Sequence, residues 1–172
     1  MKRLLLTSLL FGLLSACKQS HMVCIGDALL IPDSSYVFIY NKINGIVIDS
    51  IRNDASNDCY PFICIYRIKG NFAKIHAYNM TIVDTLIDTR GWIETRHLGT
   101  NLSHYSETVP VMCKPDINSE VSFKIINPQW EDRYRIIDAH DGWLYIQNIY
   151  NQEEAGWIAP EYQCNNPYTS CN

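Results

Sequence analysis

Several features that would define a function class are missing from the 172 residues of this chain. Its one long, predominantly apolar run covers residues 4–14, and about a dozen residues are too few to span a bilayer, which takes roughly 20. The 14 basic residues are outnumbered by 18 acidic ones, so the basic surface that nucleic acid requires is not expected. After residue 16, no run has the 3.6-residue period of an amphipathic helix.

Catalytic motifs are missing as well. The chain contains no Gly-x-Ser-x-Gly, no Gly-rich phosphate loop, no His-Glu-x-x-His and no dinucleotide-binding fingerprint. It has no Cys-x-x-Cys, which argues against a zinc site or a thioredoxin-like site. Cys64 and His76 lie on opposite arms of a predicted hairpin, where a Cys–His nucleophile pair could form, but Cys64 is inside an apolar run typical of a core strand. We therefore expect no enzyme activity, no cofactor and no metal.

What the chain does contain is a series of short runs of Val, Ile, Phe and Tyr separated by turn residues. Asn44-Gly45 stands between two such runs, and Asn-Gly is a strong hairpin signal because both residues tolerate positive φ. Lys69-Gly70-Asn71 separates another pair of runs. These patterns predict an all-β fold. In the first part of the chain the expected strands are residues 36–40, 45–51, 62–68 and 72–78.

The second part of the chain repeats this plan. The tripeptide Gly-Trp-Ile occurs at residues 91–93 and again at 156–158, although the chain has only four Trp. The separations between corresponding residues are 72 positions for Lys42 and Lys114, 71 for Phe72 and Trp143, and 65 for Trp92 and Trp157. The drop from 71 to 65 places a six-residue insertion in the first copy, which an exposed hairpin tolerates at little cost. We expect two related β domains joined near residues 100–108. The alternative is one larger β-sandwich.

The second copy carries the clearest family motifs. An Asp-Gly-Trp-Leu hairpin at residues 141–144 precedes Gly-Trp-Ile by about 13 residues, and the short turn Ala-Pro-Glu-Tyr-Gln follows. Together these motifs resemble bacterial SH3-like domains, a family of small, strongly bent five-stranded barrels. The first copy departs from the family pattern by having Phe72 where Trp is frequent, and by its longer hairpin. The resemblance implies two tandem SH3-like β-barrels, at residues 36–102 and 103–172, the second ending in a Cys-containing loop.

Each barrel would have only about 65 residues, a size at which a single hydrophobic core is marginal. We expect Gly91 and Gly156 at points where the chain bends or backbone segments approach closely. The large residues expected to fill the cores are Phe72, Trp92, Trp143 and Trp157.

The N-terminus resembles a bacterial lipoprotein signal. Lys2 and Arg3 precede the apolar run, which ends in Leu-Ser-Ala-Cys at residues 14–17. The resemblance implies that residues 1–16 are removed and that Cys17 carries the lipid, with residues 17–35 as a tether. The alternative is an ordinary secretory signal. Lys18 in place of Asp favours the outer membrane, so the expected location is the cell envelope, on the periplasmic or the surface face.

Removing residues 1–16 leaves 12 basic and 18 acidic side chains, a formal charge of −6. It also leaves six of the seven Cys unlipidated, and an even number in an exported protein suggests disulfides. The sequence does not determine their pairing. The short loop between Cys164 and Cys171 makes this pair the first candidate, and Cys59–Cys64 is the second. The alternative is that some are buried free thiols.

Binding surfaces in SH3-like barrels combine aromatic rings with acidic or polar groups from the long first loop and the hairpin tips. In the second copy, residues 127–135 fit this description, and in the first copy residues 52–62 do. The predicted ligand-binding residues are Tyr60, Asp58, Trp130, Glu131, Asp132 and Tyr134. The alternative for Trp130 is that it folds back as a lid on its own barrel.

The resemblance implies a non-catalytic, lipid-anchored protein of the cell envelope that recognises peptidoglycan stem peptide or a protein partner. An acidic surface suits a ligand with free amines, such as a stem peptide containing a diamino acid. Two alternatives remain: an inhibitor or immunity-type lipoprotein that caps a cell-wall enzyme, and a structural spacer.

Overall fold

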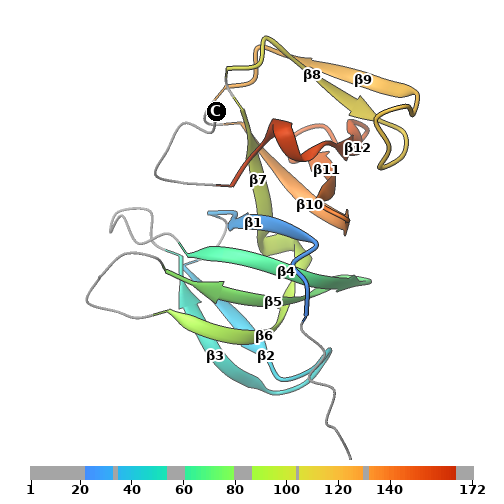
Figure 1. Ribbon diagram of the computed structural model, residues 1–172. Helices are drawn as coiled ribbons and strands as arrows, with labels where there is room; N and C mark the ends of the chain where they lie inside the picture. The colour runs from blue at the N-terminus through green and yellow to red at the C-terminus, as the bar shows by residue number, and fades with distance from the viewer. Residues whose placement is uncertain are drawn as a thin grey trace, which may run out of the picture.

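The computed structural model describes residues 22–32, 35–53, 61–79, 87–103, 105–129 and 132–165 (Figure 1). This part of the chain is all-β, which confirms the predicted fold class. The strands are β1 (Gly26–Leu30), β2 (Tyr36–Tyr40), β3 (Val47–Arg52), β4 (Phe62–Lys69), β5 (Phe72–Tyr78), β6 (Asp88–Glu94), β7 (Leu98–Leu102), β8 (Thr108–Met112), β9 (Val121–Ile126), β10 (Arg133–His140), β11 (Trp143–Asn148), β12 (Ala155–Ile158) and β13 (Gln163–Cys164). Two short 3₁₀ turns, η2 (Thr95–His97) and η3 (Pro160–Tyr162), precede β7 and β13. Within the described ranges, no helix is long and apolar enough to cross a membrane.

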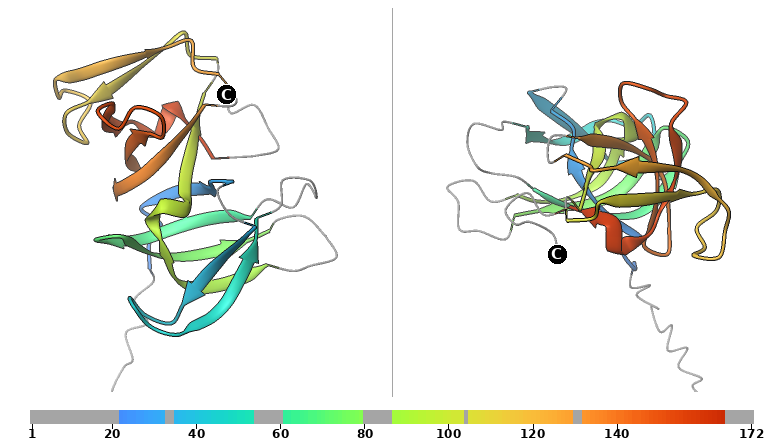
Figure 2. Two further views of the ribbon diagram at one scale, coloured as in Figure 1. Left: turned by 180° about the vertical axis from the view of Figure 1, so that it is seen from behind. Right: turned by 90° about the horizontal axis from the view of Figure 1, so that it is seen from above.

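The strands form one continuous antiparallel sheet. Its order is β3-β2-β6-β5-β4-β1-β7-β10-β11-β12-β8-β9, and β13 pairs with β7 beside this path. The sheet is bent into two halves, with β1 and β7 between them (Figure 1). In the view from behind, the hairpins β2–β3 and β8–β9 lie at opposite ends of the molecule (Figure 2). The two edges of the sheet, β3 and β9, are therefore far apart.

The two halves have the same strand register. Ile65 pairs with Ile75 in the β4–β5 hairpin, and Ile136 pairs with Ile146 in the β10–β11 hairpin. A β-bulge directly follows the first residue of each pair. Left-handed backbone at Gly70, with φ of 57°, closes the first of these hairpins as the sequence predicted. Equal registers require equal spacing of inward-facing residues, which is why the sequence separations are so regular.

Strand β7 belongs to both halves. In the first half, β1 pairs with β4 and with β7. In the second half, β7 itself takes the corresponding place, pairing with β10 and with β13. All five of its residues are buried. The predicted boundary between residues 102 and 103 therefore falls directly after a strand that the second half needs.

The predicted tether, residues 17–35, is wrong for the part that forms β1. Residues 26–30 are an interior strand of the sheet, and Ala28, Leu29 and Leu30 are buried. The apolar run at residues 28–31, which precedes Pro32, is buried in the core. Burial of this apolar surface stabilises a strand at this place relative to an extended, solvent-exposed tether.

The predicted aromatic core is also wrong. The fully buried side chains are aliphatic, and Phe72, Trp92, Trp143 and Trp157 are only half-buried. The cause is the glycine that precedes Trp92. A Cβ on Gly91 would collide with Ile39 and lie 2.7 Å from the Tyr40 carbonyl oxygen, so Gly91 faces inward. Because side chains alternate along a strand, Trp92 faces outward.

The second glycine acts in the same way. A Cβ on Gly156 would lie 2.6 Å from Cγ1 of Val111 and 3.0 Å from the carbonyl oxygen of Met112. Trp157 consequently faces outward. The prediction that both glycines mark close backbone approach is confirmed.

One disulfide lies between described residues. Cys24, just before β1, is bonded to Cys64 in β4, so the predicted pairing of Cys64 with Cys59 is replaced. β1 lies beside β4 in the sheet, which brings Cys24 to Cys64. Cys164 is also disulfide-bonded, but its expected partner Cys171 lies outside the described residues, as Cys59 does. Cys113 is a free, exposed thiol.

The shared strand predicts that the two halves unfold together. Gly91→Ala in the first half and Gly156→Ala in the second should each lower the free energy of unfolding by about 2–3 kcal/mol, because a methyl group has no space at either position. Both changes should move the same single transition in urea, followed by circular dichroism. Gly70→Ala is the control. It meets no atom within 4 Å and should cost only about 1 kcal/mol for its left-handed backbone. Two separate transitions, each sensitive to one substitution, would contradict the shared strand.

Candidate functional site

A cleft of about 410 Å³ lies where the two halves meet, and we call it the junction cleft. The first half supplies residues from β1, β4 and β5, and the second half supplies the turn between β10 and β11 together with η3 and β13. Its lining residues are Cys24, Gly26, Asp27, Phe62, Tyr78, Gly142, Pro160, Gln163 and Asn165. Neither half contains the whole site, so the cleft depends on the shared sheet.

The charged side chain that lines the junction cleft is the carboxylate of Asp27. The walls of the cleft withhold water from this carboxyl group, and this desolvation raises the pKa of Asp27 above its ordinary value of 3.8. Asp27 is nevertheless exposed as a residue, so a ligand can reach it. A cationic group placed beside it would restore the stabilisation that the carboxylate lacks in the free protein.

Two amide side chains add further hydrogen-bond acceptors. Gln163 Nε2 donates to the carbonyl oxygens of Gly142, at 2.7 Å, and Ile158, at 3.4 Å, which leaves its Oε1 to face other groups. The Oδ1 atom of Asn165 is buried and has no hydrogen-bond partner among the described residues. A buried acceptor without a donor is costly, and a ligand donor would relieve that cost. No Lys, Arg or His is among the described residues that line the cleft, so their polar chemistry favours a hydrogen-bond donor of positive charge.

Two aromatic rings form one wall. Phe62 in β4 and Tyr78 in β5 are direct cross-strand partners. Their rings are stacked, with centroids 5.9 Å apart and an interplanar angle of 22°. Both residues are half-buried, which leaves ring surface for an apolar or cationic part of a ligand.

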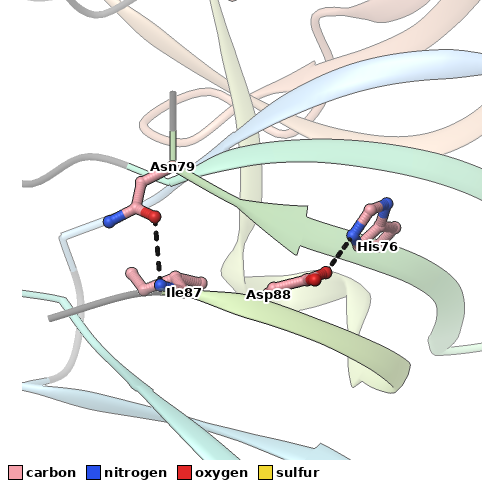
Figure 3. Close-up of polar contacts among 4 residues, drawn as sticks. All are labelled: His76, Asn79, Ile87 and Asp88. Carbon is pink, nitrogen blue, oxygen red and sulfur yellow. Dashed lines mark hydrogen bonds and ion pairs between the residues drawn. The ribbon is translucent and has the colours of Figure 1, made fainter. Parts of the chain in front are cut away.

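A histidine–aspartate pair supports this wall. The His76 ring centroid lies 5.0 Å from that of Tyr78, and His76 Nε2 lies 2.6 Å from Asp88 Oδ1 (Figure 3). Nearby, the Asn79 side-chain oxygen accepts a 3.0 Å hydrogen bond from the Ile87 amide (Figure 3). These contacts join the ends of β5 and β6 and hold the His76 ring in place beside Tyr78.

One group of metal-ligating side chains adjoins the cleft. The sulfur atoms of Cys24 and Cys64 and a carboxylate oxygen of Asp27 lie within 4.8 Å of one another. The two sulfurs are joined in a disulfide, which offers no thiolate to a metal. In the oxidised protein these residues therefore form a brace, and we assign no metal to them.

A second hollow of about 370 Å³ lies between the β4–β5 hairpin and the second half. Tyr145 and Trp157 contact edge to face there, with centroids 5.3 Å apart and an interplanar angle of 70°. Asp138 is the one charged residue among its described lining residues. None of these described residues has an orphaned acceptor such as Asn165 Oδ1 in the junction cleft.

Four of the six predicted ligand-binding residues are not among the residues that the structure describes. Asp58, Tyr60, Trp130 and Glu131 lie outside the described residues, as does the predicted lipidation site Cys17. Their roles stay predictions.

Two of the predicted residues, Asp132 and Tyr134, are described. Asp132 closes a turn, since its Oδ2 accepts a 2.9 Å hydrogen bond from the Gln129 amide. Tyr134 is buried, at 5% exposure, because β10 alternates and Tyr134 faces inward with Ile136. Desolvation, with the nearby charges of Asp132 and Glu154, raises the pKa of Tyr134 to about 12. The expectation of an exposed ring at Tyr134 is therefore wrong.

Sequence reasoning missed Asp27 and the Phe62–Tyr78 pair. The position of Cys24 just before an apolar run could have indicated that residues 24–31 belong to the fold, because a disulfide needs a fixed partner. No comparable signal marks Phe62 and Tyr78, which become neighbours only through the β4–β5 register.

Comparison with known proteins adds no identity to this geometry: no family model matches the chain, and no curated protein is significantly similar to it.

The raised pKa of Asp27 predicts a pH-dependent effect of its replacement. The protonated carboxyl is favoured in the folded state, so ionisation opposes folding, and the stability contribution present below pH 3.8 is lost as pH rises through the raised pKa. Asp27→Asn should therefore raise the free energy of unfolding at neutral pH. This gain should vanish below pH 3.8, where the carboxyl of the parent is protonated in the folded and the unfolded state. Urea denaturation of the parent and of Asp27→Asn, at neutral pH and below pH 3.8, measures this difference in the free energy of unfolding. A variant that is less stable than the parent at neutral pH would contradict this account.

Proposed function

We propose that this chain is a non-catalytic, lipid-anchored protein of the cell envelope that binds an amine-bearing peptide in the junction cleft. The ligand that best suits the cleft is a peptidoglycan stem peptide with a diamino acid. The observation that carries the proposal is a cleft that presents oxygen acceptors, an orphaned buried Asn165 Oδ1 among them, beside a stacked aromatic pair.

Two fused SH3-like barrels are part of the same proposal. Each half contains two hairpins, a fifth strand that begins near Gly-Trp-Ile, a 3₁₀ turn and a last strand, in that order. The matching register and bulges support a common origin for the halves. In this arrangement β7 is the last strand of the first barrel and the first strand of the second.

An ammonium group matches the chemistry of the cleft. It has three donors and no acceptor, and the junction cleft has a carboxylate and amide oxygens to receive them. Charge-assisted hydrogen bonds in a partly desolvated site are stronger than those in water. The aliphatic stem that carries the ammonium would lie against Phe62 and Tyr78.

A protein partner is the second candidate, and it rests on a different surface. Four apolar residues at the β2–β3 hairpin are at least half exposed: Phe38, Ile46, Val47 and Ile48. Apolar side chains gathered at one exposed hairpin are a common feature of protein interaction sites. This surface would serve an inhibitor or immunity-type lipoprotein, whereas a structural spacer needs neither surface.

The test is binding of the chain from Lys18 onward, with its disulfides intact, to purified peptidoglycan sacculi and to soluble stem peptide. Saturable binding is expected, and Asp27→Asn should weaken it at least about tenfold, since a hydrogen bond to a charged group contributes roughly 1.5–3 kcal/mol. Acetylating the free amine of the peptide should weaken binding to the parent protein equally.

Asp138→Asn is the matched control, because it removes a carboxylate from the second hollow and should leave binding unchanged. Trp130→Ala tests the loop that the sequence predicted as the ligand site. Absence of saturable binding at any salt concentration would overturn the wall-binding proposal and direct attention to the β2–β3 hairpin and a protein partner.

A further inference from the structure

We infer that the Cys24–Cys64 disulfide is a thiol-exchange site that opens on the junction cleft, and that its substrates are thiols of peptides or small molecules. The inference goes beyond peptide binding by the cleft and stands without it. It rests on the unequal exposure of the two sulfurs and on the polar groups placed at each end of the bond.

The two halves of the disulfide differ in accessibility. Cys24 is exposed and lines the junction cleft, whereas Cys64 is only 8% exposed and sits within β4. A thiol that enters the cleft can reach the Cys24 sulfur but not that of Cys64. A disulfide that serves only as a brace has no need of this asymmetry, while exchange requires one accessible sulfur.

A carboxylate lies at the Cys24 end of the bond. Asp27 Oδ1 is 3.3 Å from Cys24 Sγ. A negative charge at this distance disfavours a thiolate on Cys24 and so makes Cys24 the poorer leaving group. The carboxylate can also accept the proton of an incoming thiol, which converts the thiol to the reactive thiolate.

The Cys64 end faces a histidine. Cys64 and His76 are direct cross-strand partners in the β4–β5 ladder, which places their Cβ atoms about 5 Å apart. Their neighbours Ile63, Ile65 and Ile75 are in the core, so Cys64 and His76 project from the opposite, outer face.

His76 is fixed in position by a short polar contact, since its Nε2 lies 2.6 Å from Asp88 Oδ1. The other charged groups around it are Arg90, its partner across β6, and Lys74, the next residue on its own outer face. The ring of His76, with these two cations, would stabilise a thiolate on Cys64 and make Cys64 the better leaving group.

Two substrate thiols react with one protein disulfide, so that atoms and electrons balance. The first, as thiolate, attacks Cys24 Sγ, and a mixed disulfide with Cys24 forms as the Cys24–Cys64 bond breaks and its electron pair leaves on Cys64. A second thiolate then attacks the substrate sulfur of the mixed disulfide and releases the oxidised dimer of the two thiols. Cys64 and Cys24 each take up one proton, which balances the two protons that the attacking thiols lost. The protein ends as a dithiol reduced by two electrons, and the two thiols end as one disulfide. The reverse sequence reduces a substrate disulfide.

Reduction by glutathione is the first test. The folded, oxidised chain should be reduced by millimolar glutathione at neutral pH faster than the protein unfolds, as measured by alkylation and mass spectrometry. His76→Gln should slow this reaction about tenfold, because the leaving thiolate loses the neighbouring imidazole ring. The second half of the chain has Gln147 at the corresponding position of β11, so glutamine is compatible with the strand.

His140→Gln is the matched control. His140 is also paired with a carboxylate, Asp141 at 3.5 Å, but it lies at the β10–β11 turn away from the disulfide, and its replacement should leave the rate unchanged. Equal slowing by the two substitutions would overturn the role of His76. Reduction no faster than global unfolding would overturn the exchange site itself.

Site selectivity provides a second test. In Cys64→Ser, the remaining Cys24 should form a mixed disulfide with oxidised glutathione, whereas in Cys24→Ser the buried Cys64 should react at least about tenfold more slowly. Equal reactivity of the two thiols would contradict the predicted direction of attack. If neither variant folds, the glutathione reaction of the parent and of His76→Gln still decides the question.

Discussion

The backbone pairing of β7 is the constraint on which the rest of the molecule depends. Its two edges are used three times, by β1, β10 and β13, and all five of its residues are buried. Neither half can complete its sheet without this strand. The junction cleft exists for the same reason, because β1 and β13 both pair with β7 and so bring their loops to one place. A sheet whose two halves share a strand thus contains a site that neither half has alone.

Much of the architecture was predictable because it depends on local chemistry. Turn residues and alternating apolar runs located β2, β4 and β5 to within one or two residues, and the separations of 72, 71 and 65 positions matched the halves correctly. The role of the repeated Trp was not predictable in this way. Alternation shows which residues share a face, but only the contacts of Gly91 and Gly156 show which face is inside.

The candidate site was largely beyond prediction. The sequence prediction places Asp27 in the tether of residues 17–35, because the expected strands begin only at residue 36. Phe62 and Tyr78 are 16 positions apart and meet through hairpin register, and Gln163 reaches the cleft through the pairing of β13 with β7. Such a site is built from long-range contacts between residues that are individually unremarkable. Pairing Cys64 with the nearest cysteine in sequence failed for the same reason, since the strand beside β4 in space is β1.

The Cys24–Cys64 bond also determines which strand would bear a pulling force applied at the N-terminus. If Cys17 carries a lipid, as we propose, only residues 18–23 separate the anchor from a covalently fixed point, a span of at most about 25 Å. A pull on the anchor would then pass through the disulfide into β4, which is flanked by β5 and β1, rather than peel β1 away from its neighbours. The same short segment would keep the junction cleft close to the bilayer surface. A peptidoglycan ligand would therefore have to approach the membrane in order to bind.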